Sequence, residues 1–151
     1  MIITGKRIDR ILLTDLNLIF QLKVSDKEFE SLNRCDRNIR YKYVMKRVAD
    51  TETIWTLAKN ESTVGILIYE GQGLFPMWSS REFGEAFCQD MDPNYICLPL
   101  SLDDFVEYFI DFICEEDLLI NIFPTTNEPI GKIVDINEFA EYLNKELEDY
   151  Q

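Results

Sequence analysis

Histidine is absent from this 151-residue chain, and its absence excludes several kinds of site. Without an imidazole, the chain forms neither the Ser-His nor the Cys-His pair that activates many nucleophiles, and no histidine-bound metal. Its four cysteines, Cys35, Cys88, Cys97 and Cys114, show no C-x-x-C pair and no disulfide-framework spacing. We therefore expect reduced thiols that pack as small hydrophobic groups, and a non-enzymatic protein with no metal ion and no cofactor.

Long apolar runs are also missing. No run reaches the roughly 18 residues that a membrane-spanning helix needs. The N-terminal segment has a basic start followed by apolar residues, as a secretory leader would, but Asp15 interrupts its apolar part. No small-residue cleavage site follows, so we expect no leader, no membrane association and a cytoplasmic protein.

Basic side chains are scarce. The chain has 15 Lys and Arg against 28 Asp and Glu, which gives a net charge of −13. Residues 1–50 carry 11 basic and 7 acidic side chains, whereas residues 51–151 carry 4 basic and 21 acidic ones, a net of −17. This charge disfavours direct contact with nucleic acid and would steer a basic protein partner toward the C-terminal two thirds.

The basic side chains concentrate in one segment, residues 37–47, "RNIRYKYVMKR". Basic residues interleaved with aromatic ones can indicate nucleic-acid contact. In so acidic a protein we favour two other interpretations. These side chains either pair with the acidic part of the same chain or are solvated.

The same N-terminal capping pattern occurs at four predicted helix starts. Ser25, Ser79, Ser101 and Asp135 are each followed three residues later by a carboxylate, which is typical of N-terminal capping. The predicted helices cover residues 26–49, with a break near 36–38, then 80–89, 102–116 and 136–149. The predicted strands cover residues 53–59, 63–69, 74–78, 95–100, 118–123 and 130–134.

This order predicts an α+β fold, with a mixed, mostly antiparallel sheet of about five to six strands and about four helices packed on it as a single layer pair. Residues 25–151 form one compact domain in this interpretation. Residues 1–24 are an N-terminal extension that adds a strand or a helix.

Two groups of residues are candidates for partner binding. The carboxylates Asp103, Glu107 and Asp111 recur at every fourth position on one outward stripe of the predicted helix 102–116, and Glu115 continues it. The segment "LFPMWSSREFGEAF" brings Phe75 and Trp78 close to a predicted helix start. We favour a structural role there, in which the rings close the sheet over the helix.

Several short motifs resemble a known family. They are "RYKYVMKRVADTETIWTL", "FPMW" followed by "EF", "LPLSLDDF" and "IFPT", in that order along the chain. Over residues 25–150 the sequence is similar to the bacterial domain-of-unknown-function-2750 family. The resemblance implies a compact α+β domain and no established activity, so it assigns no catalytic residue. Residues 1–24 lie outside the pattern.

Two functions from different classes follow. The first is an acidic protein-binding domain, most concretely a bacterial immunity or inhibitor protein that neutralises a basic toxin domain such as a nuclease. Asp103, Glu107, Asp111, Glu115, Phe75 and Trp78 are its candidate binding residues. The alternative is a small ligand-binding or enzymatic domain with an aromatic pocket near Trp55, Phe75 and Trp78. A desolvated carboxylate in a cavity would favour the alternative.

Overall fold

The computed structural model describes residues 2–8 and 24–149, and in these residues it confirms the predicted α+β fold. Seven strands form one mixed sheet in the order β5-β2-β3-β4-β6-β7, with β1 paired to β3 outside this path. The strands are β1 (Ile2–Arg7), β2 (Thr53–Asn60), β3 (Thr63–Tyr69), β4 (Gln72–Met77), β5 (Ile96–Ser101), β6 (Leu119–Ile122) and β7 (Lys132–Val134). The helices are α1 (Asp26–Arg34), α2 (Arg37–Thr51), α3 (Arg81–Met91), α4 (Leu102–Asp104), the π-helix η2 (Phe105–Phe109), α5 (Ile110–Glu115) and α6 (Ile136–Glu148).

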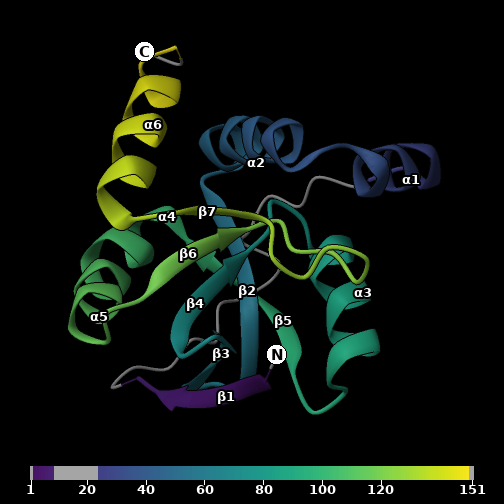
Figure 1. Cartoon of the computed structure of the whole chain (residues 1–151). Coiled ribbons are helices and arrows are strands. Elements are labelled where there is room, and N and C mark those ends of the chain that lie inside the picture. The colour runs from purple at the N-terminus through teal and green to yellow at the C-terminus, as the bar shows by residue number, and fades with distance from the viewer. Residues whose placement is uncertain (1, 9–23, 150–151) are drawn as a thin grey trace.

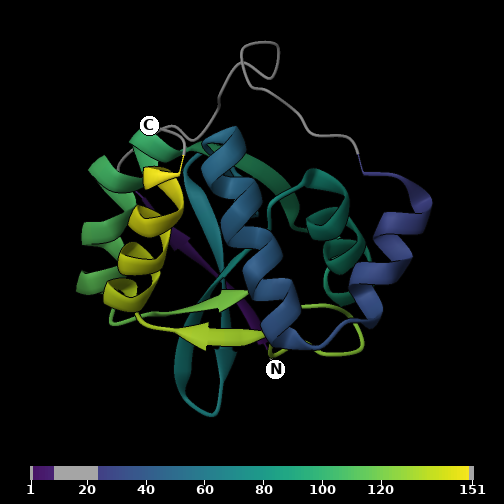
Figure 2. The same ribbon diagram turned by 90° about the horizontal axis from the view of Figure 1, so that it is seen from above.

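The helices lie against the sheet and β1 lies on the far side from most of them (Figure 1). Seen from above, α6, α2, α3 and α1 follow one another across the molecule, with α5 beside α6 (Figure 2). Consequently α5 and α1 occupy opposite ends of this row of helices. Strand pairing is antiparallel except between β4 and β6, which run parallel, so their carboxyl ends meet at one edge.

Capping determines where three of the helices begin. The side chains of Ser25, Ser101 and Asp135 each accept a hydrogen bond, of 2.8–3.1 Å, from the backbone amide three residues later. These bonds satisfy amides that the first turn of a helix leaves without partners. They confirm three of the four predicted helix starts.

The prediction for Ser79 is wrong. The main chain of Trp78 still exchanges two hydrogen bonds of 2.9 Å with Trp55, so the backbone stays extended beyond it. Ser80 is extended too, at φ −146° and ψ 150°, and α3 begins only at Arg81 without a side-chain cap. Strand pairing therefore delays the helix by one residue relative to the capping pattern.

The break predicted near residues 36–38 is confirmed. Asp36 is extended, and its Oδ1 accepts hydrogen bonds from the amides of Asn38, at 2.8 Å, and Ile39, at 3.0 Å. A new helix, α2, starts there. When the continuous α4, η2 and α5 are counted as one helix, this split and the presence of β1 explain why the described residues contain one more helix and one more strand than the sequence predicts.

The N-terminal residues that the structure describes form a strand. β1 pairs antiparallel with β3 along its full length, from Ile2 opposite Ile68 to Arg7 opposite Thr63. Part of the predicted extension, residues 1–24, thus contributes to the sheet. Residues 9–23 lie outside the described part of the chain.

Candidate functional site

Four predicted binding carboxylates lie on the surface of one segment, residues 102–117, in which residues 102–115 are helical and the last two form a turn. Asp103, Glu107, Asp111 and Glu115 are all exposed. The segment contains seven carboxylates and no basic side chain. The predicted acidic stripe is therefore present at the surface, and its role in binding stays a prediction.

The opposite side of this segment holds it against the core. Phe105 and Phe109 are buried and stack on each other, with ring centroids 6.3 Å apart and planes within 4°. Phe75 of β4 and Phe139 of α6 add further ring contacts at 5.5–6.2 Å. Burying such large rings stabilises the segment by several kcal/mol in total, at about 1.5–3 kcal/mol per fully buried side chain. This anchoring fixes the acidic side outward.

The middle of the segment is a π-helix. The amide of Ile110 bonds to the carbonyl of Phe105, five residues earlier, rather than to the residue four earlier. Val106 and Tyr108 lie in this turn, with 56% and 37% of their surface exposed. We use the name acidic helix surface for Asp103, Val106, Glu107, Tyr108, Asp111 and Glu115. It presents two large side chains among carboxylates.

Phe75 and Trp78 are not available to a partner. Both side chains are 0% exposed, and Trp55 is 3% exposed. The Trp78 indole Nε1 donates to the carbonyl of Pro124 at 2.9 Å, so its one polar atom is satisfied inside the protein. We therefore remove Phe75 and Trp78 from the binding surface. The space around these rings is filled core, which argues against the alternative aromatic pocket.

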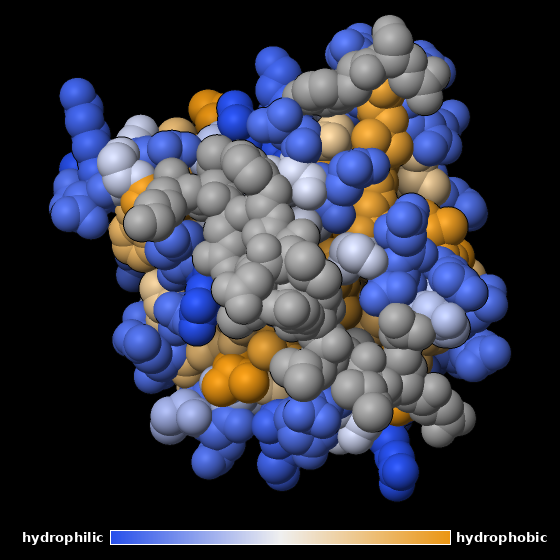
Figure 3. Space-filling model, turned by 180° about the vertical axis from the view of Figure 1, so that it is seen from behind, coloured by the Kyte–Doolittle hydropathy of each residue, from blue (hydrophilic) through white to orange (hydrophobic). Residues whose placement is uncertain are grey.

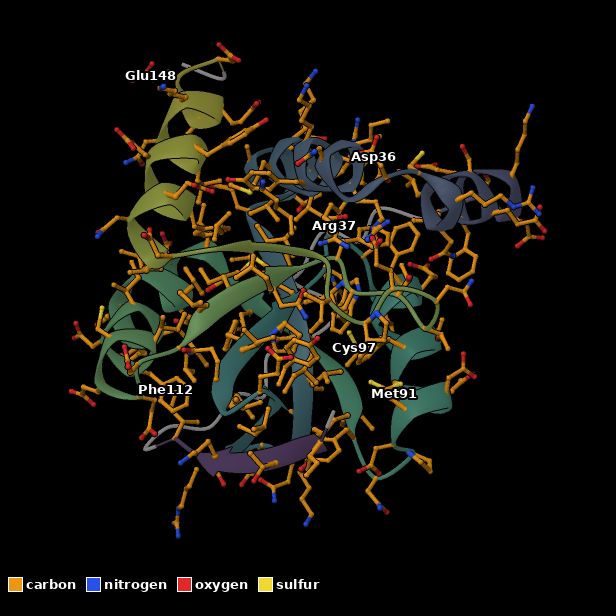
Figure 4. All side chains as sticks on the ribbon, in the orientation of Figure 1. Asp36, Arg37, Met91, Cys97, Phe112 and Glu148 are labelled. Atoms are coloured by element: carbon orange, nitrogen blue, oxygen red, sulfur yellow. The ribbon has the colours of Figure 1, made fainter. Side chains whose placement is uncertain are left out.

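A second site, which the sequence did not indicate, is built by the loop that follows β6. We call residues 123–131 the β6–β7 loop. Buried Arg40 of α2 holds its start: Nε donates to the carbonyl of Phe123 at 3.1 Å, Nη1 to that of Cys35 at 2.6 Å, and Nη2 to Glu128. Arg37 donates to the same carboxylate at 3.1 Å. Figure 4 shows Arg37 at the start of α2, beside this loop.

The prediction that the basic segment pairs with the acidic part of the chain is confirmed for Arg37 and Arg40. Their partner, Glu128, is 91 and 88 residues away. Phe123 has a positive φ of 56°, which is rare for a bulky residue and needs strong support from its surroundings. The guanidinium of Arg40, 5.7 Å from the Phe123 ring centroid, is part of that support.

The far end of the β6–β7 loop is held by Asn121. This fully buried side chain donates to the carbonyl of Pro129 at 3.0 Å and accepts from the amide of Gly131 at 2.8 Å. A Cβ at position 131 would collide with the carbonyl oxygen of Ile122. Only glycine therefore fits where the chain re-enters the sheet as β7.

Hydrogen bonds from Arg40 and Arg37 lower the pKa of Glu128, against a smaller opposing effect of burial. A lowered pKa in the folded state stabilises the fold above the unfolded pKa of about 4.3, and this contribution is lost as the pH falls through the lower folded value. Glu128→Gln should therefore cost stability at pH 7, by less than about 1 kcal/mol because the carboxylate is partly exposed. The difference from the wild type should shrink between about pH 5 and pH 3.

Urea unfolding at several pH values measures this difference. Glu30→Gln removes an exposed carboxylate on α1 and serves as the control. A Glu128→Gln penalty that stayed constant from pH 7 to pH 3 would contradict the assigned role of Glu128.

The cysteines fall into two classes. Cys88 and Cys97 are buried, and burial raises the pKa of Cys88 to about 12 and that of Cys97 well above its usual range. Figure 4 shows Cys97 between the sheet and α3. These two thiols pack as the predicted small hydrophobic groups. Cys35 is partly exposed and Cys114 is exposed.

On the face seen from behind, the visible part formed by the described residues is largely hydrophilic, with smaller hydrophobic patches between the polar side chains (Figure 3). No helix within residues 2–8 and 24–149 is long and apolar enough to cross a bilayer. Across the same residues, no group of three or more Cys, Asp or Glu side chains is placed to hold a metal ion.

The fold and these surfaces define a small acidic α+β domain with an exposed carboxylate-rich helix. Comparison with known proteins identifies its family. Residues 41–143 match the family described as "Protein of unknown function (DUF2750)", and the chain belongs to this family. The match confirms the resemblance seen in the sequence, although β1 and α1 lie outside it. Neither a curated protein nor a solved structure matches the chain.

Proposed function

We propose that this chain is a non-enzymatic binding protein that uses the acidic helix surface to bind a basic protein. The observation that carries the proposal is the exposure of Val106 and Tyr108 among Asp103, Glu107 and Asp111. Binding surfaces commonly combine an aromatic or apolar centre with charged groups around it. A solvated acidic helix needs no such side chains.

Electrostatics supports a basic partner. Neighbouring carboxylates on a helix repel one another, at a cost of a few tenths of a kcal/mol per pair, and a bound cationic surface would relieve that repulsion. The net charge of −13 would also speed the encounter with a positive protein.

The most concrete form of this function is an immunity or inhibitor protein that neutralises a basic toxin domain. A nuclease toxin must present positive charge to bind phosphates. A row of exposed carboxylates can occupy such a surface in place of nucleic acid. The small size and the rigid anchoring of the helix by buried phenylalanines suit this role, because a preordered surface loses little entropy on binding.

Charge reversal at Asp103, Glu107 and Asp111 should slow association with such a partner. Replacing all three by lysine should reduce the association rate at least about tenfold at low salt, because steering depends on the local field. Surface plasmon resonance against a panel of purified basic nuclease toxin domains measures the rate. The difference in association rate between the variant and the wild type should diminish at 1 M salt, because charges more than about 3 Å apart are then screened.

A matched control separates local from overall charge. Asp26, Glu30 and Glu61 are exposed carboxylates on α1 and in the β2–β3 turn, and α1 lies at the other end of the fold from α5 (Figure 1). Both triple variants change the net charge from −13 to −7. Equal association rates for the two variants, or no binding by any basic toxin domain, would exclude this function for the acidic helix surface.

A further inference from the structure

A cavity of about 280 Å³ opens between α1, α3 and the β6–β7 loop. It adjoins the carboxyl ends of the parallel strands β4 and β6, because the β6–β7 loop follows β6 and α3 follows β4. Ligands of α/β sheets commonly bind at that edge. Its volume is near the lower end of the usual range for small-ligand pockets, roughly 300–1,000 Å³, and therefore suits one short chain or a single side chain.

Aromatic rings form one wall of this cavity. Phe29 of α1 and Phe83 of α3 stack with centroids 5.4 Å apart and planes within 5°, and Phe87 also lines it. Phe83 in turn contacts Phe123 at 4.5 Å. The face of an aromatic ring carries partial negative charge, which attracts cations and stacks well with planar ones.

The polar lining is anionic. Asp90 is the single charged residue among the described residues that line the cavity. Its Oδ2 accepts a hydrogen bond from Thr126 Oγ1 at 2.7 Å, whereas Oδ1 accepts none from the described part of the chain. Asn33 uses its amide nitrogen to donate to the carbonyl of Phe29 at 3.0 Å, so its oxygen is the atom left for a ligand. Both groups offer acceptors.

The cavity is also preorganised. Arg40 and Asn121 hold the two ends of the β6–β7 loop. Within the loop, the carbonyl of Pro124 accepts a hydrogen bond from Trp78 Nε1. The Thr125 hydroxyl oxygen accepts from the amide of Glu128 at 2.9 Å, which closes the tip of the loop. A loop held at so many points loses little entropy when a ligand binds.

We propose that this cavity binds an alkylguanidinium group. The planar cation would stack on the Phe29 and Phe83 wall, donate to Asp90 Oδ1 and Asn33 Oδ1, and place its alkyl chain toward solvent. The group is carried either by a free small molecule or by an arginine side chain of a peptide, and both sources share this chemistry. This site is separate from the acidic helix surface and does not depend on the function proposed for that surface.

Titration followed by two-dimensional NMR tests the proposal, with N-butylguanidinium as the probe. The amides of Thr126 and Asn127 should shift with saturation in the millimolar range. N-butylurea has the same shape without the charge and should bind at least about tenfold more weakly. Equal binding of N-butylurea, or shifts confined to other parts of the molecule, would overturn the proposal.

Two variants test whether Asp90 contributes to binding in this cavity. Asp90→Asn keeps an oxygen for Thr126 and should preserve the fold while weakening N-butylguanidinium binding about tenfold. Glu85→Gln removes a carboxylate from the same helix outside this cavity and should leave the affinity unchanged. Unchanged affinity in Asp90→Asn, or an equal loss in Glu85→Gln, would refute the site.

A final comparison distinguishes the sources of the group. The capped tripeptide acetyl-Gly-Arg-Gly-amide presents the same guanidinium on a peptide. Tighter binding of the tripeptide than of N-butylguanidinium supports an arginine side chain as the ligand, and weaker binding supports a free small molecule. Absence of binding by both probes would overturn the proposal.

Discussion

Replacing Arg40 by methionine should lower the free energy of unfolding by about 3 kcal/mol or more. The side chain is 2% exposed and reaches three acceptors, the carbonyls of Phe123 and Cys35 and the carboxylate of Glu128. Methionine fills a similar volume but donates nothing. A buried acceptor left without a partner costs about 1–3 kcal/mol, and two carbonyls would be affected.

Arg40→Met should also loosen the β6–β7 loop locally, in addition to lowering the free energy of unfolding of the whole domain. Phe123 keeps its positive φ while the Arg40 guanidinium holds its carbonyl and faces its ring. Without that support the β6–β7 loop should loosen. Hydrogen exchange should therefore accelerate at the amide of Glu128, which bonds to the Thr125 hydroxyl inside the loop.

Arg37→Met provides the matched control. Arg37 binds the same Glu128 carboxylate, but its side chain is 47% exposed. An exposed ion pair is worth about 0–1 kcal/mol, so this variant should remain close to the wild type in urea unfolding. Arg40→Lys keeps the charge without the planar fork of donors and should fall between the two. Similar losses in Arg37→Met and Arg40→Met would show that burial of Arg40 contributes nothing.

Gly84→Ala should also destabilise the protein, by about 1–2 kcal/mol. Gly84 lies in the middle of α3, where alanine is intrinsically better than glycine by about 1 kcal/mol. The new Cβ would collide with Cys97 Sγ on β5 and would lie 3.1 Å from the Trp78 ring. Overpacking a well-filled core costs about 1–3 kcal/mol, so the collision should outweigh the gain in helix propensity.

Cys97→Ala removes the sulfur and gives a test of this explanation. In that background Gly84→Ala should become neutral or stabilising, because the colliding atom is gone while the helix propensity gain remains. The double-mutant cycle, measured by urea unfolding, should give a coupling energy of about 2 kcal/mol between the two positions. If the effects of the two substitutions on the free energy of unfolding were strictly additive, α3 and β5 would not be in contact through this sulfur.

Much of the local structure could be predicted from short stretches of sequence. A capping side chain needs only a backbone amide three residues away, so the patterns at Ser25, Ser101 and Asp135 were sufficient. The break at Asp36 was visible for the same reason. The helix start predicted at Ser79 was wrong because Trp78 pairs with Trp55, 23 positions earlier in the chain, and that pairing extends the strand. A local pattern carries no information about such a partner.

The candidate sites divide in the same way. Exposure of the carboxylates on the acidic helix surface follows from the helical period of the buried phenylalanines, which the sequence displays. By contrast, the burial of Phe75 and Trp78 depends on helices and loops that cover them from distant positions. The cavity beside Asp90 has no sequence signature, since its lining comes from α1, α3 and the β6–β7 loop.

Composition and hydrophobic periodicity are enough to establish the kind of protein this is: an acidic α+β domain without histidine chemistry, with an outward row of carboxylates from Asp103 to Glu115. Composition and periodicity act through neighbouring residues, so they can be read without a fold. The role of Arg40, which lies 88 residues from Glu128 in the chain and holds a loop beside a cavity, becomes visible only in the folded protein. Contacts between residues so far apart exist only after the chain has folded.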